Sequence, residues 1–208
     1  QIRTEKIFKV GVVGTNPIIN KFKENSNYVN GLIMEDIYFD EAKYFEFKDF
    51  KNIRKSYEEL LTDNDIVYVA TRVEKRYQYI KEALLNNKHV ISESPFSLKK
   101  NQVEELMRIA KENNLRLFDS IKTAFLLSFW RMILLVKGGL IGEVKAIDVT
   151  CTSLENKEWF SKTHFATSIT EWGSYVLLPI FKILGIKYDN DDCFSLNDSE
   201  MYYIFARI

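Results

Sequence analysis

Short runs of apolar and β-branched residues alternate with longer amphipathic segments through the first half of the chain. Runs of this length, bounded by polar and turn-forming residues, are typical of buried strands. The pattern predicts strands at Val10–Gly14, Leu32–Phe39, Ile66–Thr71, His89–Ser92 and Leu115–Phe118.

The segments between these runs have helical spacing and recognisable ends. Ser56 and Glu59 form a capping box, in which each side chain satisfies a free backbone N–H at the start of a helix. A second helix is expected to end near Asn87, and a third to begin near Ser97 and end near Asn114, because asparagine tolerates the left-handed turn that closes a helix. Strands alternating with helices of this length predict right-handed crossovers and a parallel sheet covered on both faces.

The pattern changes after about Ser120. We expect a helix at Phe125–Lys137, a long alternating strand at Gly142–Thr150, a helix at Glu171–Leu184 and a final strand at Met201–Ile208. This order predicts the beginning of a second α/β domain with an open sheet.

Composition and charge argue against several classes of protein, namely nucleic-acid-binding, membrane and metal-binding proteins. The 208 residues include 29 basic and 29 acidic side chains, so no net field favours nucleic acid or an anionic membrane. The longest apolar stretch, Ala124–Val136, is shorter than the roughly 20 residues that cross a bilayer. No leader pattern is visible at the start. Cys151 and Cys193 have no metal-ligand spacing, and two isolated cysteines favour a reducing, cytoplasmic setting. We expect no metal site.

Gly14, Thr15 and Asn16 lie where the first strand turns into a helix. A dinucleotide fingerprint needs glycines there, so that backbone N–H groups can approach a pyrophosphate and the helix can pack closely on the strand. Gly14 keeps the first glycine position, whereas Asn16 and the bulky Ile19 take the second and third. Pro17 suits the start of a helix whose N-terminus faces an anion. The alternative is a plain structural turn.

An acidic residue at the end of the second strand would bind the ribose hydroxyls of a dinucleotide and disfavour a 2′-phosphate. Asp36 lies 22 residues after Gly14, close to the usual spacing. This favours NAD over NADP, and the alternative is a solvated acid at the strand end.

Two further segments carry a family resemblance. They are Val67–Thr71 and the stretch from Ala83 to Val90, followed by Glu93-Ser94-Pro95. Together with Gly139–Val144 they resemble the glucose-fructose oxidoreductase / inositol dehydrogenase (Gfo/Idh/MocA) family of NAD(P)-dependent sugar oxidoreductases. That family usually has Glu-Lys-Pro, with the lysine beside the nicotinamide and the reacting carbon.

In this chain Ser94 stands in the place of that lysine. A serine hydroxyl holds no positive charge and needs an adjacent base to act in catalysis. The resemblance therefore allows either a catalytic Ser94, or retention of Glu93 and Pro95 for structure with catalysis lost. The family position of Thr71-Arg72 is a loop beside the nicotinamide. Arg72 and Arg76, the latter at the usual histidine position, suit a carboxylate or phosphate, or form an ordinary surface pair.

Glu171 and Tyr175 resemble the second catalytic segment of the family, an acid followed by histidine or tyrosine four residues later. Residues four apart share one face of a helix. The glycines that usually precede the acid are absent. His164 lies just before this segment and is either a substitute catalytic group or structural.

The chain is thus identified as a degenerate, C-terminally short family member. We expect a Rossmann doubly wound parallel sheet in residues 1–121, and a shortened α/β substrate and dimerisation domain in residues 122–208. The resemblance implies NAD(P)-dependent hydride transfer to or from a sugar or polyol, with cofactor binding weakened or lost. The alternatives are a non-catalytic homologue that binds a sugar or nucleotide or serves in an assembly, and a lyase or epimerase using bound NAD. A homo-oligomer is expected, because an incomplete sheet leaves edges to cover.

Overall fold

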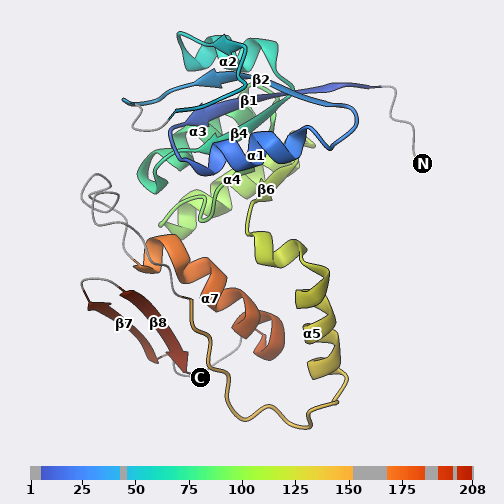
Figure 1. Cartoon of the computed structure of the whole chain (residues 1–208), viewed down its shortest axis with the longest axis vertical. Helices are drawn as coiled ribbons and strands as arrows, with labels where there is room; N and C mark the ends of the chain where they lie inside the picture. Colours follow the sequence, from blue (N-terminus) through green and yellow to red (C-terminus); the bar gives the residue numbers. More distant parts are fainter. Residues whose placement is uncertain (1–5, 43–45, 152–167, 186–191, 199–200, 208) are drawn as a thin grey trace. The chain divides into compact units, whose positions relative to one another are not determined.

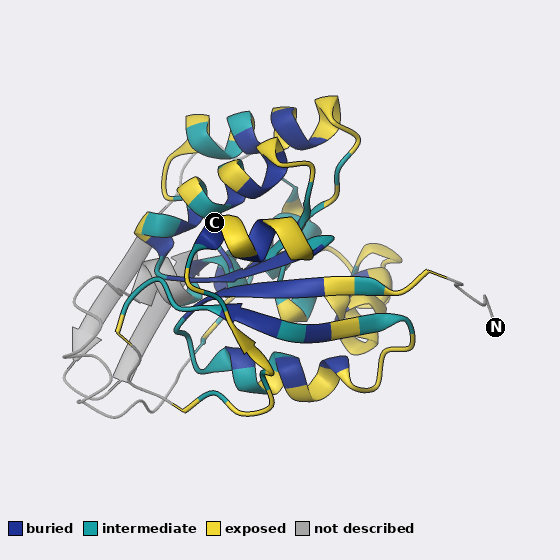
Figure 2. Ribbon diagram, turned by 90° about the horizontal axis from the view of Figure 1, so that it is seen from above, coloured by how far each residue is buried: buried dark blue, intermediate teal, exposed yellow. Residues whose placement is uncertain are grey.

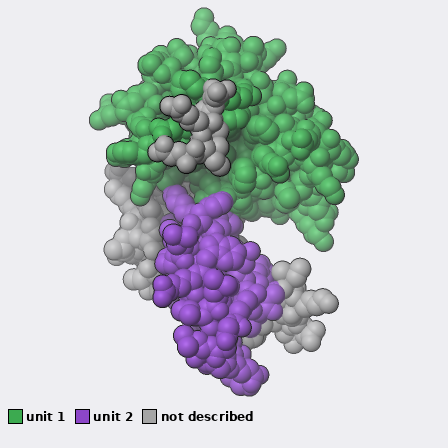
Figure 3. Space-filling view, turned by 90° about the vertical axis from the view of Figure 1, so that its right-hand side faces the viewer, with its two compact units in different colours: residues 1–120 green, residues 121–208 purple. Residues whose placement is uncertain are grey.

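The structure is a computed structural model that describes residues 6–42, 46–151, 168–185, 192–198 and 201–207. Its internal contacts divide the chain into two compact units, Gln1–Ser120 and Ile121–Ile208, coloured separately in Figure 3. Each unit is described by itself.

The first unit is built on a six-stranded sheet in the order β3-β2-β1-β4-β5-β6, in which every neighbouring pair is parallel (Figure 1). This confirms the predicted doubly wound parallel sheet. The strand missing from the prediction is β3, which has two exposed residues and therefore too little pattern to detect. The strands are β1 (Phe8–Gly14), β2 (Leu32–Tyr38), β3 (Asn52–Ile53), β4 (Ile66–Ala70), β5 (His89–Ser92) and β6 (Leu117–Asp119).

Helices cover both faces of this sheet. Val12 and Val13 are adjacent in β1 but belong to different apolar clusters, because successive strand residues point to opposite faces. The buried strands between the helical layers are dark blue in Figure 2. On one face Ile19 of α1 is buried in the Val12 cluster, and on the other Leu60 and Leu106 lie in the Val13 cluster. The helices are α1 (Ile18–Ser26), α2 (Tyr57–Asp63), α3 (Val73–Leu85) and α4 (Lys100–Glu112).

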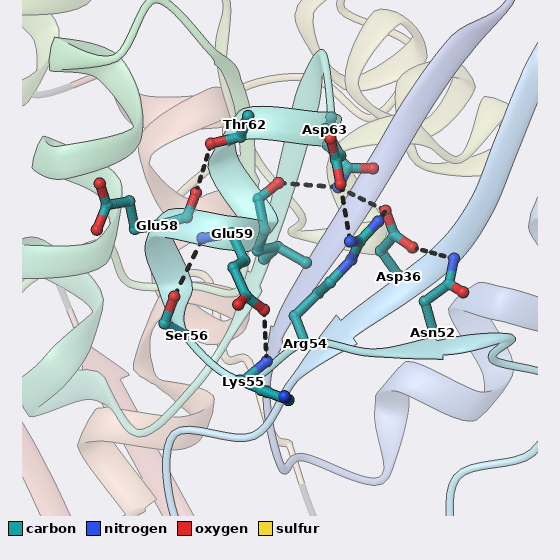
Figure 4. A network of polar contacts seen from close by, with 11 residues as sticks. Asp36, Asn52, Arg54, Lys55, Ser56, Glu58, Glu59, Thr62 and Asp63 are labelled. Carbon is teal, nitrogen blue, oxygen red and sulfur yellow. Dashed lines mark hydrogen bonds and ion pairs between the residues drawn. The ribbon is translucent and has the colours of Figure 1, made fainter.

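The predicted helix ends are present. Asn87 and Asn114 adopt φ angles of 59° and 53°, the left-handed conformation expected there. The Ser56 hydroxyl accepts the Glu59 N–H at 3.2 Å, which confirms the N-cap (Figure 4). The Glu59 carboxylate accepts the N–H of Lys55 at 2.9 Å, one residue earlier than a capping box would have it.

The second unit contains the short 3-10 helix η1 (Lys122–Phe125), the helices α5 (Leu127–Lys137) and α7 (Ser168–Leu184), and the strands β7 (Asp192–Asp198) and β8 (Met201–Arg207). The two strands pair antiparallel. β8 matches the predicted final strand, whereas β7 was not predicted.

The predicted strand at Gly142–Thr150 is wrong as a strand. No strand is assigned to these residues, and no strand of the described part pairs with them. Their alternation is nonetheless real, because Ile147 and Val149 pack against Val176 and Ile180 of α7. The alternating apolar residues therefore indicate that one side of this segment is buried. Strand formation requires, in addition, a neighbouring strand with which the backbone can form hydrogen bonds.

Candidate functional site

The carboxyl ends of β2, β1, β4 and β5 form one edge of the sheet. The chain runs from β1 outward to β3 and then crosses back to β4 on the other side of β1. This reversal between β1 and β4 is the switch point at which open parallel α/β sheets bind ligands. The residues that follow these strands are Gly14–Asn16, Phe39–Glu41, Thr71–Arg72 and Glu93–Pro95.

Gly14 is required at this edge by the close approach of β1 to β4. Its φ angle is 128°, and a Cβ atom would lie 2.2 Å from the Ala70 carbonyl oxygen. The next turn stays close, since the Asn16 N–H donates to the same carbonyl at 3.3 Å. A glycine with this geometry allows the tight turn that the first position of the fingerprint requires.

Asn16 engages the backbone at the start of α1. Its side-chain oxygen accepts the Ile18 N–H at 3.0 Å, and its carbonyl accepts the Ile19 N–H at 3.0 Å. Pro17, which precedes the first helical residue, has no N–H to offer. The donors that a pyrophosphate would use are therefore partly taken by Asn16.

Ile19 does not obstruct the fold as its bulk suggested. Its side chain is fully buried among Met34, Ile37 and Tyr68. The apolar cluster has room for it, so the substitution at the third glycine position is accommodated by packing beneath the turn.

Asp36 lies within β2, paired in register with Gly11, rather than at the strand end. Its carboxylate accepts hydrogen bonds from Asn52 at 2.6 Å, Arg54 at 3.0 Å and Asn64 at 2.9 Å (Figure 4). Burial opposes ionisation, but these hydrogen bonds outweigh it and hold the pKa of Asp36 below its ordinary value. Arg54 also pairs with Asp63 at 2.7 Å. This geometry fits a structural network better than ribose recognition.

Asp40 is the acid that follows the end of β2, and the sequence reasoning missed it. Its carboxylate pairs with Lys75 at 3.1 Å, yet the side chain is fully buried and the Oδ1 atom has no hydrogen-bond partner. Burial raises the pKa of Asp40, and the contact with Lys75 opposes that rise. Counting from the end of the apolar run instead of from Gly14 would have found it.

The two arginines behave differently. Arg72, half-buried at the start of α3, pairs with Glu41 at 3.3 Å. Arg76 is only 2% exposed, and its guanidinium donates to main-chain carbonyls, including that of Thr71 at 3.0 Å. The guanidinium, which was expected to bind a carboxylate or phosphate or to form a surface pair, is therefore buried against the backbone. Thr71 is buried, with its hydroxyl donating to the Arg72 carbonyl at 3.1 Å.

Glu93 anchors the end of β5 to its neighbours. One carboxylate oxygen accepts the Tyr68 hydroxyl at 2.6 Å and the Ser120 hydroxyl at 2.6 Å. The Ser94–Pro95 peptide bond is cis. These contacts fix the segment that resembles the family motif, with Glu93 in a supporting position.

Ser94 leaves a polar group free at this edge. The residue is 7% exposed, and its hydroxyl has no hydrogen-bond partner. A buried hydroxyl without a partner is unfavourable by about 1 to 3 kcal/mol, which a bound ligand can offset. Ser94 and Asp40 thus have buried oxygen atoms without a hydrogen-bond partner after β5 and β2, on opposite sides of the Gly14 turn.

The candidate residues of the second unit are only partly described. Positions 171 and 175 both lie in α7, one turn apart. The Tyr175 ring is half-buried and lies 5.8 Å from the Trp172 ring. The Glu171 side chain and His164 lie outside the described residues. Within the described residues, no group of histidine, cysteine and acidic side chains has the arrangement to hold a metal, and no helix is long and apolar enough to cross a membrane.

The model of the oxidoreductase family with an NAD-binding Rossmann fold (GFO_IDH_MocA) matches residues 8–120. The chain belongs to this family. The matched residues contain the whole six-stranded sheet and every edge segment described above. The family resemblance and the Rossmann fold are thereby confirmed.

Named relatives agree with this assignment. The chain is 26% identical over 129 residues to scyllo-inositol 2-dehydrogenase (NADP(+)) IolU of Bacillus subtilis, covering 59% of this chain and 39% of that protein. Scyllo-inositol dehydrogenase from Lactobacillus casei, solved with bound NAD(H) and scyllo-inositol, superimposes with a TM-score of 0.78 at 19% identity, over 94% of this chain and 61% of that one. Biliverdin reductase from Synechocystis, solved with biliverdin and NADP+, superimposes with a TM-score of 0.72 at 21% identity, over 92% of this chain and 63% of that one. The chain thus spans about two fifths of the curated relative, and the solved structures show the fold alone.

Proposed function

We propose that the first unit binds a nicotinamide dinucleotide along the carboxyl edge of its sheet, with NAD favoured over NADP. The observation that carries this proposal is the pair of buried, unpartnered oxygen atoms of Asp40 and Ser94 on either side of the Gly14 turn. A dinucleotide has hydroxyl and amide groups near both ends and a pyrophosphate between them, which matches this order.

The residues of the edge fit such a cofactor. The turn at Gly14 and Thr15 would approach the pyrophosphate, and the free oxygen of Asp40 would accept a ribose hydroxyl while disfavouring a 2′-phosphate. Thr71 and Ser94 would border the nicotinamide half. Arg72 and Pro95 would shape the walls of the same half. Because Asn16 caps α1, we expect the pyrophosphate to be bound more weakly than by an intact fingerprint.

We further propose that the chain is an oxidoreductase acting on a sugar or polyol. When bound, the nicotinamide ring supplies the hydride acceptor or donor. On the family resemblance, the candidate catalytic groups are Ser94 in the first unit and, in the second, Tyr175 and Glu171 of α7 together with His164. The likeness to scyllo-inositol dehydrogenases supports the substrate class. Residues 122–208 would supply the substrate and self-association surfaces, and the cytoplasm would suit the isolated cysteines.

The second candidate function is that of a non-catalytic homologue that binds a dinucleotide or sugar. Ser94 favours it, because a neutral hydroxyl with no hydrogen-bonded base neither stabilises nor transfers charge as a lysine does. Asn16 favours it as well, since a weakly held cofactor suits sensing or assembly better than turnover.

A panel of sugars and polyols that includes scyllo-inositol separates the two functions. Formation of NADH is measured for the wild type and for Ser94→Lys, which restores the residue usual in the family. The oxidoreductase proposal expects slow wild-type turnover that rises in the variant and is lost in Glu171→Ala. Absence of turnover in both proteins, with NADH still bound, would establish the non-catalytic homologue instead.

A further inference from the structure

Arg76 joins two loops that border the candidate site. From the first turn of α3, its Nε atom donates to the Thr71 carbonyl at 3.0 Å. Its Nη1 atom donates to the carbonyls of Ser94 at 2.7 Å and Pro95 at 3.1 Å. One buried guanidinium therefore holds the backbone that follows β4 and the backbone that follows β5.

The sheet itself does not hold these loops together. The β4–β5 ladder has its last residue pair at Val69 and Ser92, followed by one hydrogen bond from the Glu93 N–H to the Val69 carbonyl at 3.0 Å. Beyond that point the strands separate into their loops. The hydrogen bonds of Arg76 continue the connection where the ladder ends.

A charge at this position is energetically unfavourable without such partners. Burial of a guanidinium carries a desolvation penalty, and a cation in the first turn of a helix is opposed by the helix dipole. Hydrogen bonds from a charged donor to carbonyls are each stronger than neutral ones, and Arg76 makes three of them. Lysine has a point charge without the planar fork, so it cannot reproduce the whole set.

Ser94 is fixed from two directions as a result. Its own carbonyl is bound by Arg76, and the side chain of the preceding residue, Glu93, is bound by Tyr68 and Ser120. The polar group left over in this turn is the Ser94 hydroxyl, which is buried and unpartnered. Rigid backbone on both sides of an unpaired hydroxyl is the arrangement expected of a preorganised ligand contact.

We propose that Arg76 is a positioning residue, which aims the Ser94 hydroxyl at the nicotinamide half of the bound dinucleotide. This inference rests on the proposed function. In a dinucleotide bound at this edge, the adenosine half would lie on the β2 side of the Gly14 turn and the nicotinamide half on the β4 and β5 side. Arg76 therefore acts on one half of the ligand only, whereas a purely structural role would affect both halves alike.

The test compares NADH with ADP, which lacks the nicotinamide half. Binding of both is measured by calorimetry on the full chain for the wild type, Arg76→Met, Arg76→Lys and the control Arg108→Met, whose exposed arginine pairs with Glu112 on α4. The fluorescence of bound NADH reports the nicotinamide environment, and thermal melts report folding. We expect Arg76→Lys to lower NADH affinity about 10-fold, as for loss of one well-placed hydrogen bond. ADP affinity should stay within about twofold, and Arg108→Met should match the wild type.

A double-mutant cycle of Arg76→Lys and Ser94→Ala decides whether Arg76 acts through Ser94. This cycle does not require Arg76→Met to fold. If Arg76 acts through Ser94, Arg76→Lys lowers NADH affinity when Ser94 is present but has no further effect when combined with Ser94→Ala. Equal losses in both backgrounds, or a parallel loss of ADP and NADH affinity, would overturn the inference while leaving the proposed function intact. A wild type that binds neither nucleotide would overturn both.

Discussion

The side-chain oxygen of Asn16 accepts the backbone N–H of Ile18 at 3.0 Å, so the first N–H of α1 is bound by a residue at the second glycine position of the fingerprint. Asn16→Gly should free that donor and restore a glycine of the fingerprint. Because hydrogen bonds to charged groups contribute about 1.5 to 3 kcal/mol each, NADH affinity should rise roughly 10-fold or more. Loss of the cap should lower stability by only a few tenths of a kcal/mol.

Calorimetry on Asn16→Gly measures the change, with Asn27→Gly at the opposite end of the same helix as a control. Equal NADH affinity in the wild type and Asn16→Gly would show that the cap does not compete with the ligand.

Gly14 and Gly11 lie in the same strand but should differ in their tolerance of a methyl group. At Gly14 a Cβ would lie 2.2 Å from a backbone carbonyl oxygen, in a conformation with φ of 128°. At Gly11 it would lie 2.8 Å from side-chain atoms of Leu60 and Asn64, and the φ angle is not in the left-handed region. We expect Gly14→Ala to lower the free energy of unfolding by about 3 kcal/mol or more, and Gly11→Ala by about 1 to 2 kcal/mol. Urea unfolding followed by circular dichroism measures both. Equal losses would contradict the contact geometry.

Much of the first unit is predictable from sequence because its determinants are local. Apolar runs, the Ser56 cap and the left-handed asparagines each depend on neighbouring residues. The candidate site is less predictable, because its contacts join residues far apart in sequence. The partners of Asp36 come from β3 and from the residues that flank α2, and its spacing from Gly14 gives no sign of these contacts.

The contacts of Arg76 also depend on residues far apart in the sequence. Its residue type and position suggested an anion ligand, whereas the fold buries it against carbonyls of Thr71, Ser94 and Pro95. At Gly142–Thr150 the alternation marked the residues that pack on α7, but strand formation depends on a neighbour that the segment cannot specify.

The Asp36 network predicts a pH dependence of stability. The pKa of Asp36 in the folded chain is below its ordinary value of 3.8, so its contribution is fully present above that value and is lost as the pH falls through the folded pKa. Asp36→Asn should lower the free energy of unfolding at neutral pH by about 2 kcal/mol, because it leaves buried donors and Arg54 less well paired. The gap between wild type and variant should close below pH 3.8.

Urea unfolding of both proteins between neutral and acidic pH measures this gap. Asp63→Asn serves as the control, since Asp63 pairs with the same Arg54 but its side chain is 46% exposed and should contribute less. A gap that stays constant with pH would mean that the charge of Asp36 is not what stabilises the network.

The second unit predicts self-association. Leu127, Trp130 and Leu134 of α5 are exposed apolar side chains within one helix. Neighbouring exposed apolar residues mark interaction surfaces, and we expect the chain to be a homo-oligomer in light scattering. Leu134→Glu should shift the mass toward the monomer, and Met107→Glu, at an exposed apolar position of α4, should not. A stable, monodisperse wild-type monomer would contradict this.

Calorimetric titration of the wild-type chain with NADH tests the central claim most directly, namely that the carboxyl edge around Gly14, Asp40 and Ser94 holds a nicotinamide dinucleotide. The predicted result is saturable binding at one site per chain with a Kd between about 1 µM and 1 mM, weakened in Asp40→Asn. No binding heat at millimolar NADH would contradict the claim.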